Sequence, residues 1–392
     1  MPTLTTAAPI IATANRLGQV KEYYFSRKLR EIAELRAADH DVLNLGIGSP
    51  DLPPHPDVIA ELHTASAQPD THAYQGYQGI PELRAAFAQW YDTYFDVELA
   101  ADAEVLPLIG SKEGIMHISM AYLNPGDEVL VPNPGYPTYT SATELAGGTV
   151  RTYNLTAANG WYPDLDELAQ TDLTKVKIMW VNYPHMPTGT PANRSFYEDL
   201  VTFAQRHGIL IVNDNPYAFI LADEQHSILA IPGAKNVALE LNSLSKCHNM
   251  AGWRVGMLAG AKRHLEPVIR FKSNMDSGMY KPVQLAAVKA LQLPASWYEQ
   301  LNDHYRARRE VAAKLLEDLG CVIAPNQVGM FLWARIGESY PTGYALADAV
   351  LDNYRVFITP GGIFGPAGAP YVRISLCSSV EKLETARKRL NA

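Results

Sequence analysis

Short apolar runs recur through the middle of the chain, and segments with helical periodicity lie between them. A continuous apolar run is typical of a strand buried on both faces, whereas apolar residues three or four apart predict an amphipathic helix. Strands are predicted at residues 105–109, 128–131, 176–181, 209–213, 237–241 and 255–259. Helices are predicted at residues 24–37, from 81 to about 94, 115–123 and 194–206. This alternation predicts an α/β fold with a mostly parallel central sheet flanked by helices.

The pattern changes beyond about residue 290. A long helix is predicted at 298–319, strands near 331–336 and 371–376, and helices near 344–353 and 380–390. Such a layout predicts a second, smaller α+β domain. We therefore expect an N-terminal segment at 1–45 that packs with the small domain, a large domain at 46–288 and a small C-terminal domain at 289–392.

Composition places the chain among ordinary globular proteins, because 47% of its 392 residues are hydrophobic and 19% are charged. A net charge of -8 without a basic run argues against binding to nucleic acid or to an anionic membrane surface. Cys247, Cys321 and Cys377 are odd in number and lack metal-ligand spacing, so neither a disulfide framework nor a metal site is expected. No secretory signal pattern or bilayer-length apolar run is present, and we expect a cytoplasmic protein without a membrane partner.

The polar turn that follows the predicted strand at 237–241 carries the most reactive combination of side chains. Ser243 and Ser245 offer hydroxyls, Lys246 offers an amine that becomes nucleophilic if its pKa is lowered, and Arg254 offers a fixed cation. This combination suits an aldehyde that carries a phosphate. Two alternatives compete: Lys246 as a solvated surface charge, and Ser243 to Lys246 as the Ser-x-x-Lys of serine acyl-transfer enzymes. Those enzymes also require Ser-Asp-Asn and Lys-Thr-Gly tripeptides, and neither occurs in this sequence.

Glycine-rich and polar turns follow several of the other predicted strands. Residues 110–114, Gly-Ser-Lys-Glu-Gly, lie between a strand and a helix, where free backbone N–H groups and the helix dipole bind anions. Residues 182–189 and 213–217 follow two further strands, and functional loops of parallel sheets cluster at such ends. The turn at 44–51 contains Gly46 and Gly48 but lacks the third glycine of a dinucleotide-binding fingerprint.

Taken in order, these turns resemble those of fold-type I pyridoxal-phosphate (PLP) enzymes, and most closely those of the class I/II aminotransferases. The resemblance covers nearly the whole chain, and the ordered set of motifs is more specific than any single motif. Within the family, it is closest to the branch that contains LL-diaminopimelate and alanine-type aminotransferases. It rests on Gly110-Ser-Lys-Glu-Gly114, Asn182-Tyr-Pro-x-x-Pro-Thr-Gly189, Asp214-x-x-Tyr217, Ser243-x-Ser-Lys246 with Arg254, and Arg373.

The resemblance implies a role for each side chain in these turns. Lys246 would form an imine with PLP and, once displaced by substrate, would move the proton between substrate and cofactor. Asp214 would pair with the pyridine nitrogen, Tyr217 would donate to the phenolic oxygen, and Tyr136 would stack on the ring. Phosphate contacts would come from Gly110, Ser111, Lys112, Ser243, Ser245 and Arg254.

The resemblance also implies how substrate is held. Arg373 would clamp the substrate α-carboxylate with two hydrogen bonds, and Gly46 and Ile47 would line the substrate side. Tyr74 would reach the phosphate bound by the neighbouring subunit, which implies a homodimer with shared active sites. The expected partners are an amino acid, a 2-oxo acid and a second copy of this chain. Further candidate contacts to the substrate side chain are Tyr23, Tyr24, Arg27, Lys28, Tyr280 and Lys281.

Met186 departs from the family pattern, which has an asparagine before the Pro-Thr-Gly of this turn. That asparagine would donate a hydrogen bond to the phenolic oxygen of the cofactor, and a thioether cannot. We therefore predict that the imine of Lys246 keeps its proton to higher pH than in relatives with asparagine. The neighbouring His185 could compensate in part for the missing donor, but we expect it to be an ordinary loop residue.

The predicted activity is transfer of an amino group from an L-amino acid to a 2-oxo acid by a ping-pong mechanism. Carbon–sulfur lyases and ring-closing synthases on the same fold share the lysine, the aspartate, the tyrosine and both arginines, so a lyase or a related elimination enzyme stays an alternative. A non-catalytic PLP-binding regulator is a more remote alternative. The residues before Asn44 contain neither a helix-turn-helix pattern nor a basic surplus, which argues against that class.

Overall fold

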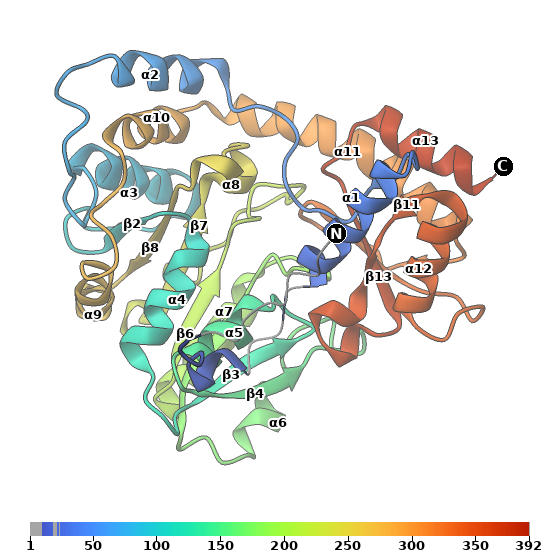
Figure 1. Cartoon of the computed structure of the whole chain (residues 1–392). Coiled ribbons are helices and arrows are strands. Elements are labelled where there is room, and N and C mark those ends of the chain that lie inside the picture. The colour runs from blue at the N-terminus through green and yellow to red at the C-terminus, as the bar shows by residue number, and fades with distance from the viewer. Residues whose placement is uncertain (1–9, 19–21, 23, 392) are drawn as a thin grey trace.

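A seven-stranded sheet forms the centre of the larger part of the molecule (Figure 1). The computed structural model describes residues 10–18, 22 and 24–391. The strands lie in the order β2-β8-β7-β6-β5-β3-β4, and only β8 runs antiparallel to its neighbours. Their bounds are β2 (Val105–Leu108), β3 (Glu128–Asn133), β4 (Thr149–Asn154), β5 (Val176–Val181), β6 (Leu210–Asp214), β7 (Ala238–Ser243) and β8 (Gly256–Gly260). The predicted mostly parallel sheet is confirmed.

Helices cover both faces of this sheet and create two apolar layers (Figure 1). Because successive strand residues point to opposite faces, Leu239 and Leu241 of β7 join the layer of α4, α5 and α9. Met179 and Val181 of β5 join the opposite layer with α7. The helices of this part are α2 (Pro56–Ser66), α3 (Pro81–Phe95), α4 (Ser111–Tyr122), α5 (Thr138–Leu145), α6 (Leu165–Ala169), α7 (Arg194–His207), α8 (Leu244–Cys247), α9 (Lys262–Lys272) and α10 (Lys281–Leu291).

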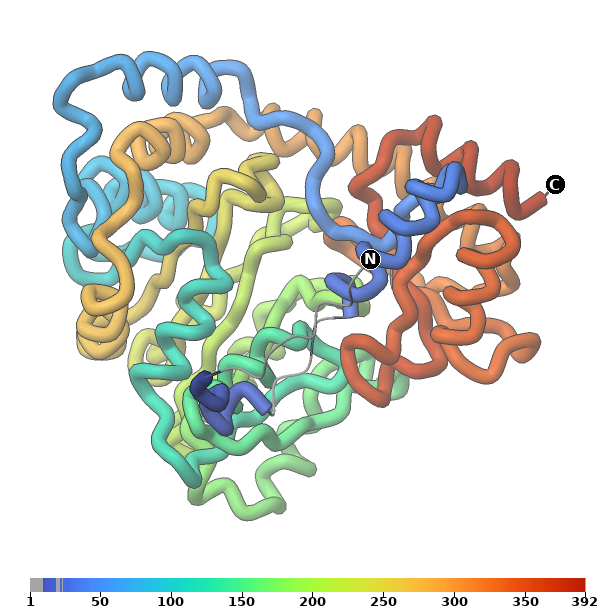
Figure 2. The backbone as a smooth tube through the Cα atoms, viewed as in Figure 1, coloured from blue at the N-terminus to red at the C-terminus, as the bar shows by residue number. Residues whose placement is uncertain are grey.

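The C-terminal part is built on a four-stranded antiparallel sheet in the order β12-β13-β10-β9. Figure 2 shows it as the orange and red body beside the larger part. Its elements are α11 (Ala295–Asp318), β9 (Val322–Ile323), β10 (Phe331–Arg335), α12 (Gly343–Tyr354), β11 (Val356–Phe357), β12 (Thr359–Pro360), β13 (Tyr371–Ser375) and α13 (Val380–Leu390). Short 3-10 helices are η1 (Asn15–Gly18), η2 (Ile228–Ala230), η3 (Ala234–Asn236), η4 (Ala251–Trp253), η5 (Gly361–Phe364) and η6 (Pro366–Gly368).

The N-terminal segment packs against this C-terminal body, as Figures 1 and 2 both show. Helix α1 (Tyr24–Ala37) is followed by β1 (Leu43–Asn44), which pairs in parallel with β11. Ile32 and Val42 form a small apolar cluster with Leu351 and Phe357. Residues distant in sequence therefore meet beside the junction of the two sheets.

The structure differs from the sequence prediction at several elements, each for a local reason. Helix α4 begins at Ser111 rather than at residue 115, because Gly110 adopts a left-handed φ of 80° and lets the helix begin directly after the turn. Strand β4 is an edge strand with mostly accessible residues, so it lacks the apolar run of a buried strand. Helices α2, α9 and α10 were also missed, and α9 contains Pro267, which normally argues against a helix interior.

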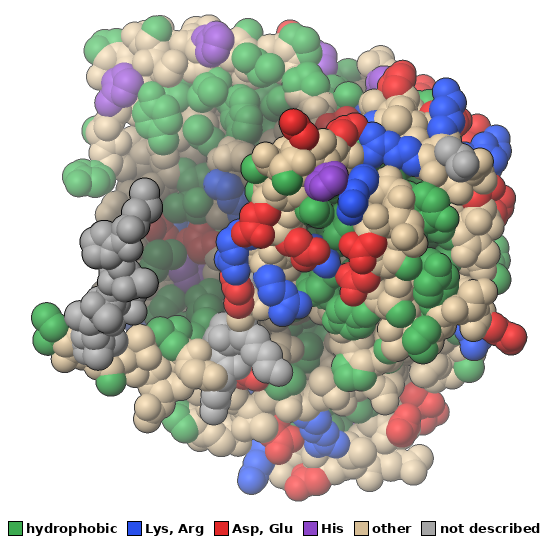
Figure 3. Space-filling view, turned by 45° about the vertical axis from the view of Figure 1, so that its right-hand side comes forward, with side chains coloured by type: hydrophobic (Ala, Val, Ile, Leu, Met, Phe, Trp, Pro, Cys, Tyr) green, Lys and Arg blue, Asp and Glu red, His purple; other side chains and the backbone are tan. Residues whose placement is uncertain are grey.

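The surface between the two sheets is hollowed, and Figure 3 shows charged side chains within the hollow. The carboxyl ends of β5, β6 and β7 and the N-terminus of α4 all reach this region. In parallel sheets, ligands bind at such strand ends. Within the described part of the chain, no helix has the length and hydrophobicity needed to cross a bilayer.

Candidate active site

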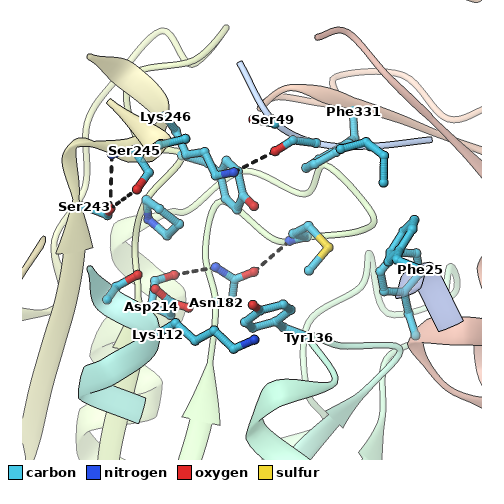
Figure 4. Close-up of a pocket in the computed structure, with 18 of the residues that line it drawn as sticks. Phe25, Ser49, Lys112, Tyr136, Asn182, Asp214, Ser243, Ser245, Lys246 and Phe331 are labelled. Atoms are coloured by element: carbon cyan, nitrogen blue, oxygen red, sulfur yellow. Dashed lines mark hydrogen bonds between the residues drawn. The ribbon is translucent and has the colours of Figure 1, made fainter. Parts of the chain in front are cut away.

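A cavity of about 560 Å³ lies where the strand ends of the larger sheet face β10 and β13 (Figure 4). It gathers most of the residues that the sequence singled out, although they come from distant parts of the chain. Those that line it are Ile47, Ser111, Lys112, Tyr136, Asp214, Tyr217, Ser243, Ser245, Lys246, Arg254 and Arg373.

Three of the predicted residues do not line the cavity. Gly46 lies behind it, where its carbonyl accepts a hydrogen bond from Arg373, and a Cβ atom at Gly110 would overlap the guanidinium of Arg254. Gly46 therefore contacts the lining residue Arg373, and Gly110 leaves room for the lining residue Arg254. Tyr74 is 93% exposed and contributes nothing to the cavity of its own chain.

Lys246 lies in the short helix α8 directly after β7, and it points into the cavity (Figure 4). The side chain of Ser243 accepts a hydrogen bond from the backbone N–H of Ser245 and so begins this helix. The ammonium Nζ of Lys246 donates to the carbonyl of Gly48 over 2.7 Å. Burial lowers the pKa of Lys246, which favours the neutral, nucleophilic amine.

Asp214 ends β6 on the floor of the cavity and is 5% exposed. Tyr139 donates to its Oδ2 over 2.9 Å, while its Oδ1 is buried without a hydrogen-bond partner among the described residues. Burial raises the pKa of Asp214 to about 6, and the hydrogen bond from Tyr139 opposes that shift. A buried carboxylate oxygen without a partner fits a ligand that brings a cationic N–H, such as a protonated pyridine.

Groups suited to an anion lie at another end of the cavity. The N-terminus of α4 begins at Ser111 after a left-handed Gly110, and the guanidinium of Arg254 lies against that glycine. The hydroxyls of Ser243 and Ser245 lie 2.8 Å apart and face the same region (Figure 4). Helix N-termini, hydroxyls and a guanidinium are the usual ligands of phosphate.

Arg373 projects from β13 into a box of aromatic rings. Its guanidinium carbon lies 3.9 Å from the ring centre of Phe331 and 4.7 Å from that of Phe364. Its Nη2 donates to Gly46 over 2.9 Å, and its Nη1 lies 3.2 Å from the sulfur of Met186. Apolar walls strengthen the attraction between this cation and a carboxylate, because water is excluded from the pair.

Two tyrosines border the space between Asp214 and Arg373. The ring of Tyr217 packs edge-on against Phe331 with centroids 6.0 Å apart, and burial raises the pKa of Tyr217, which keeps its hydroxyl protonated. Tyr136 packs edge-on against Tyr139, with centroids 5.6 Å apart. Tyr217 is therefore a hydrogen-bond donor at this wall, and Tyr136 offers an aromatic face.

Hydrogen bonds through Asn182 connect the turn that contains Met186 to the end of β6. Asn182 accepts a hydrogen bond from the backbone of Met186 over 2.9 Å, and its amide donates to the carbonyl of Asp214. His185 is 3% exposed, lies 2.8 Å from the hydroxyl of Thr188, and does not line the cavity. Burial lowers the pKa of His185 to about 3, so it is neutral. These contacts agree with a structural role for His185.

The candidate contacts to the substrate side chain lie outside this cavity, and Tyr23 lies outside the described residues. Lys28 pairs with Glu31 and Asp348, and Lys281 lies 3.7 Å from Asp70. Of the N-terminal helix, Phe25 does line the cavity, although the sequence singled out its neighbours instead.

Sequence reasoning missed several residues that shape the site. Tyr139 holds Asp214, Asn182 joins Asp214 to the Met186 turn, and Phe331 and Phe364 enclose Arg373. Tyr139 lies three residues after Tyr136, in the first turn of helix α5, and this proximity was the only local signal. The aromatic box has no local signal, since its rings come from separate elements.

Comparison with known proteins identifies the class to which this fold and cavity belong. The family described as aminotransferase class I and II matches residues 40–390, and this chain belongs to that family. Its members depend on PLP, so the chain is a PLP-dependent aminotransferase that transfers an amino group from an amino acid to a 2-oxo acid. The predicted family, fold, cofactor and activity are confirmed.

Individual relatives span almost the whole chain. LL-diaminopimelate aminotransferase from Dehalococcoides mccartyi (strain BAV1) is 40% identical over 96% of this chain and 97% of its own length. The enzyme of that name from Aquifex aeolicus is 39% identical over 96% of this chain and 98% of its own length. Apo-BacF from Bacillus subtilis is a similar solved structure, with a TM-score of 0.93, 33% identity and coverage of 97% and 98%. These relatives agree with the predicted branch of the family.

Proposed function

We propose that PLP lies in the 560 Å³ cavity with its pyridine nitrogen at Asp214 and its phosphate at Ser111, Ser243, Ser245 and Arg254. The observation that carries this orientation is the buried Oδ1 of Asp214, which has no partner among the described residues. Lys112 and Gly110 belong to the phosphate end, Tyr217 to the phenolic oxygen and Tyr136 to the ring face. Bound PLP supplies an aldehyde that bonds an amine and a ring that withdraws electrons from the substrate.

The residues that surround this cavity have separate roles in the proposed reaction. The amine of Lys246, with its lowered pKa, would hold the aldehyde of PLP and would act as the base that takes up and returns the Cα proton of the substrate. Asp214 keeps the pyridine nitrogen protonated. Arg373 binds the α-carboxylate and so turns the Cα–H bond toward Lys246, with Gly46 and Ile47 beside it. The aromatic box excludes water from this pair.

The proposed amino donor is LL-diaminopimelate, because the curated relatives at 39% to 40% identity carry the name of that activity. A second carboxylate on such a substrate needs its own recognition. Among the described residues that line the cavity, the cations are Lys112, Lys246, Arg254 and Arg373, and all four have a role in the proposal above. The second carboxylate of the substrate would therefore be bound by neutral hydrogen-bond donors or by residues of a second subunit.

A second subunit completes the site in this proposal. Tyr74 is 93% exposed, and Tyr77 and Tyr280 are 46% and 43% exposed, although large aromatic side chains are usually buried. We propose that this surface is covered in a homodimer and that Tyr74 reaches the phosphate of the partner. The division into an N-terminal segment at 1–45, a PLP-binding domain at 46–288 and a small domain at 289–392, and the cytoplasmic location, stay predictions.

A half-reaction tests the activity and the donor together. The PLP-loaded protein is mixed with LL-diaminopimelate, L-glutamate, L-alanine or L-aspartate, and the visible absorbance is followed. Loss of the PLP band that 2-oxoglutarate or pyruvate restores is expected, fastest with the preferred donor. Lys246→Ala should abolish it, whereas Lys262→Ala, which changes an exposed lysine, should not. Spontaneous return of the band with release of ammonia or a thiol would instead indicate a lyase.

Mixing two inactive variants tests the shared site. A hybrid of a Lys246→Ala subunit and a Tyr74→Ala subunit has one site with an intact Lys246 that receives an intact Tyr74 from the partner. We expect such a mixture to regain tight PLP binding in part of its sites. If each Tyr74 serves its own chain, no hybrid site is complete and mixing restores nothing.

A further inference from the structure

The loop between β1 and α2 offers backbone carbonyls to both cations that would handle the substrate. The carbonyl of Gly46 accepts a hydrogen bond from Nη2 of Arg373 over 2.9 Å. The carbonyl of Gly48 accepts one from Nζ of Lys246 over 2.7 Å, and Figure 4 draws this bond beside Ser49. The position of this loop therefore sets where the carboxylate clamp and the reactive amine lie relative to each other.

Packing holds one side of the loop. A Cβ atom at Gly48 would overlap the ring of Phe331, and one at Gly46 would meet Phe357 and Thr359. The hydroxyl of Thr359 also donates to the carbonyl of Gly46 over 3.1 Å. The first part of the loop therefore packs closely against side chains of the C-terminal part.

An ion pair between a buried arginine and a partly exposed aspartate ties the loop to helix α11. Arg308, in helix α11 and 4% exposed, donates to both carboxylate oxygens of Asp51, with Nη1 at 2.7 Å from Oδ1 and Nη2 at 2.9 Å from Oδ2. Its Nη1 also donates to the carbonyl of Leu376 over 3.0 Å. Neither Arg308 nor Asp51 lines the cavity. The planar fork of the guanidinium fixes direction as well as distance, which a lysine cannot do.

We infer that the Arg308–Asp51 pair is a positioning element for the transamination reaction, because it fixes the Gly48 carbonyl that receives the amine of Lys246. Because one N–H of the amine donates a hydrogen bond to this carbonyl, the nitrogen lone pair must point away from it. This restricts the directions in which the amine can take up a proton, and the substrate side is one of them. Proton transfer requires the donor and acceptor atoms to be about 3 Å apart and aligned. The inference rests on the role proposed above for Lys246.

The chain contains a matched control pair away from the cavity. Arg84, in helix α3 and 9% exposed, donates to Asp102 over 2.7 Å and to the carbonyl of Gly79 over 2.7 Å. It therefore makes the same kinds of contact as Arg308, to one carboxylate and one backbone carbonyl. Replacing either arginine by lysine keeps the charge but removes the fork.

The experiment compares Arg308→Lys with Arg84→Lys in the PLP-loaded protein. The half-reaction is measured with L-glutamate and with α-deuterated L-glutamate, or with the two forms of whichever panel donor reacts faster in the wild type. We expect Arg308→Lys to slow the half-reaction roughly 10- to 100-fold and to raise the deuterium isotope effect, because proton transfer is misaligned. The dissociation constant of PLP should stay within about twofold, since the phosphate end is unchanged. Arg84→Lys should alter neither rate nor isotope effect.

A crystal structure of the PLP-free Arg308→Lys protein gives a readout that does not depend on activity, and the distance from Nζ of Lys246 to the carbonyl of Gly48 should increase. An unchanged distance with an unchanged isotope effect would overturn the inference. So would a rate loss matched by an equal loss of PLP affinity, because the pair would then be merely structural. If Lys246→Ala keeps the wild-type half-reaction, the role proposed for Lys246 fails first, and the two failures are thereby distinguished.

Discussion

The hydrogen bond from Tyr139 to Asp214 controls the charge of the carboxylate that would hold the pyridine nitrogen. Tyr139 is fully buried and donates to Oδ2 over 2.9 Å, and its ring stacks on Trp180 with centroids 4.9 Å apart. Tyr139→Phe removes only the hydroxyl and leaves this stacking in place. The variant therefore tests the hydrogen bond with little change in packing.

The size of the effect follows from the two protonation states of Asp214. A hydrogen bond to the ionised carboxylate contributes roughly 1.5–3 kcal/mol and one to the neutral acid roughly half as much. Their difference, about 0.75–1.5 kcal/mol, corresponds at its upper end to about one pKa unit. The pKa of Asp214, about 6 in the PLP-free wild type, should therefore rise to about 7 in Tyr139→Phe. At pH 7, the ionised fraction should fall from about nine-tenths to about half.

The assay is the dissociation constant of PLP measured from pH 5 to pH 9. Protonated Asp214 has no charge with which to hold a pyridinium, so affinity should decline as pH falls through the pKa of Asp214. We expect that decline to begin about one pH unit higher in Tyr139→Phe than in the wild type. The titration of PLP itself is the same in both proteins and cancels in the comparison.

Tyr153→Phe is the matched control, because Tyr153 is buried in strand β4 and donates to the carbonyl of Trp180 over 2.7 Å without a hydrogen bond to Asp214. It should leave the pH dependence unchanged. A Tyr139→Phe protein that folds normally and shows the wild-type pH dependence would refute the reasoning. The hydrogen bond would then contribute equally to both protonation states.

Three further substitutions test Asp214, Met186 and Arg373. The pKa of Asp214 is about 6 in the folded protein and lower in the unfolded chain, so the free energy of unfolding falls as pH rises from about 4 to 6. Asp214→Asn removes this charge and should raise the free energy of unfolding of the PLP-free protein at pH 7 by up to about 3 kcal/mol. Urea unfolding measures this gain, and at pH 4 no gain is expected. Met186→Asn adds a donor near the phenolic oxygen and should lower the spectroscopic pKa of bound PLP by about one unit; no shift would contradict this. Arg373→Lys should raise KM for the donor roughly 10- to 100-fold while the PLP absorbance stays unchanged, and an unchanged KM would exclude its role as the carboxylate clamp.

The sequence could predict those parts of the site that depend on local pattern. Lys246 follows an apolar strand, and Ser111 begins a helix after a glycine. In both cases a few consecutive residues are enough to predict the position of the side chain. The hydrogen bond between Tyr139 and Asp214 joins residues 75 positions apart, and the ion pair between Asp51 and Arg308 spans 257 positions. No local pattern encodes such pairs, because they exist only after the sheets have packed.

The same division explains which elements were predicted. Helix α1 and strand β5 have the predicted bounds, since their apolar spacing is regular over the whole element. Strand β4, at the edge of the sheet, lacks a continuous apolar run, and helix α9 was missed although it is amphipathic, because Pro267 lies inside it. Local reasoning therefore fails where tertiary packing overrides propensity.

The PLP-free site is electrostatically unfavourable in a way that binding would relieve. Asp214 is ionised at neutral pH although burial opposes its charge, and the amine of Lys246 has a lowered pKa for the same reason. A ligand with a cationic nitrogen at one end, a dianionic phosphate at the other and an aldehyde between them would pair with Asp214, with the anion-binding groups near Ser111 and Arg254, and with Lys246. Such a ligand at 100 times its dissociation constant stabilises the fold by about 2.7 kcal/mol, so cofactor binding and folding are coupled. The burial that raises the pKa of Asp214 and lowers that of Lys246 would therefore also favour binding of such a ligand.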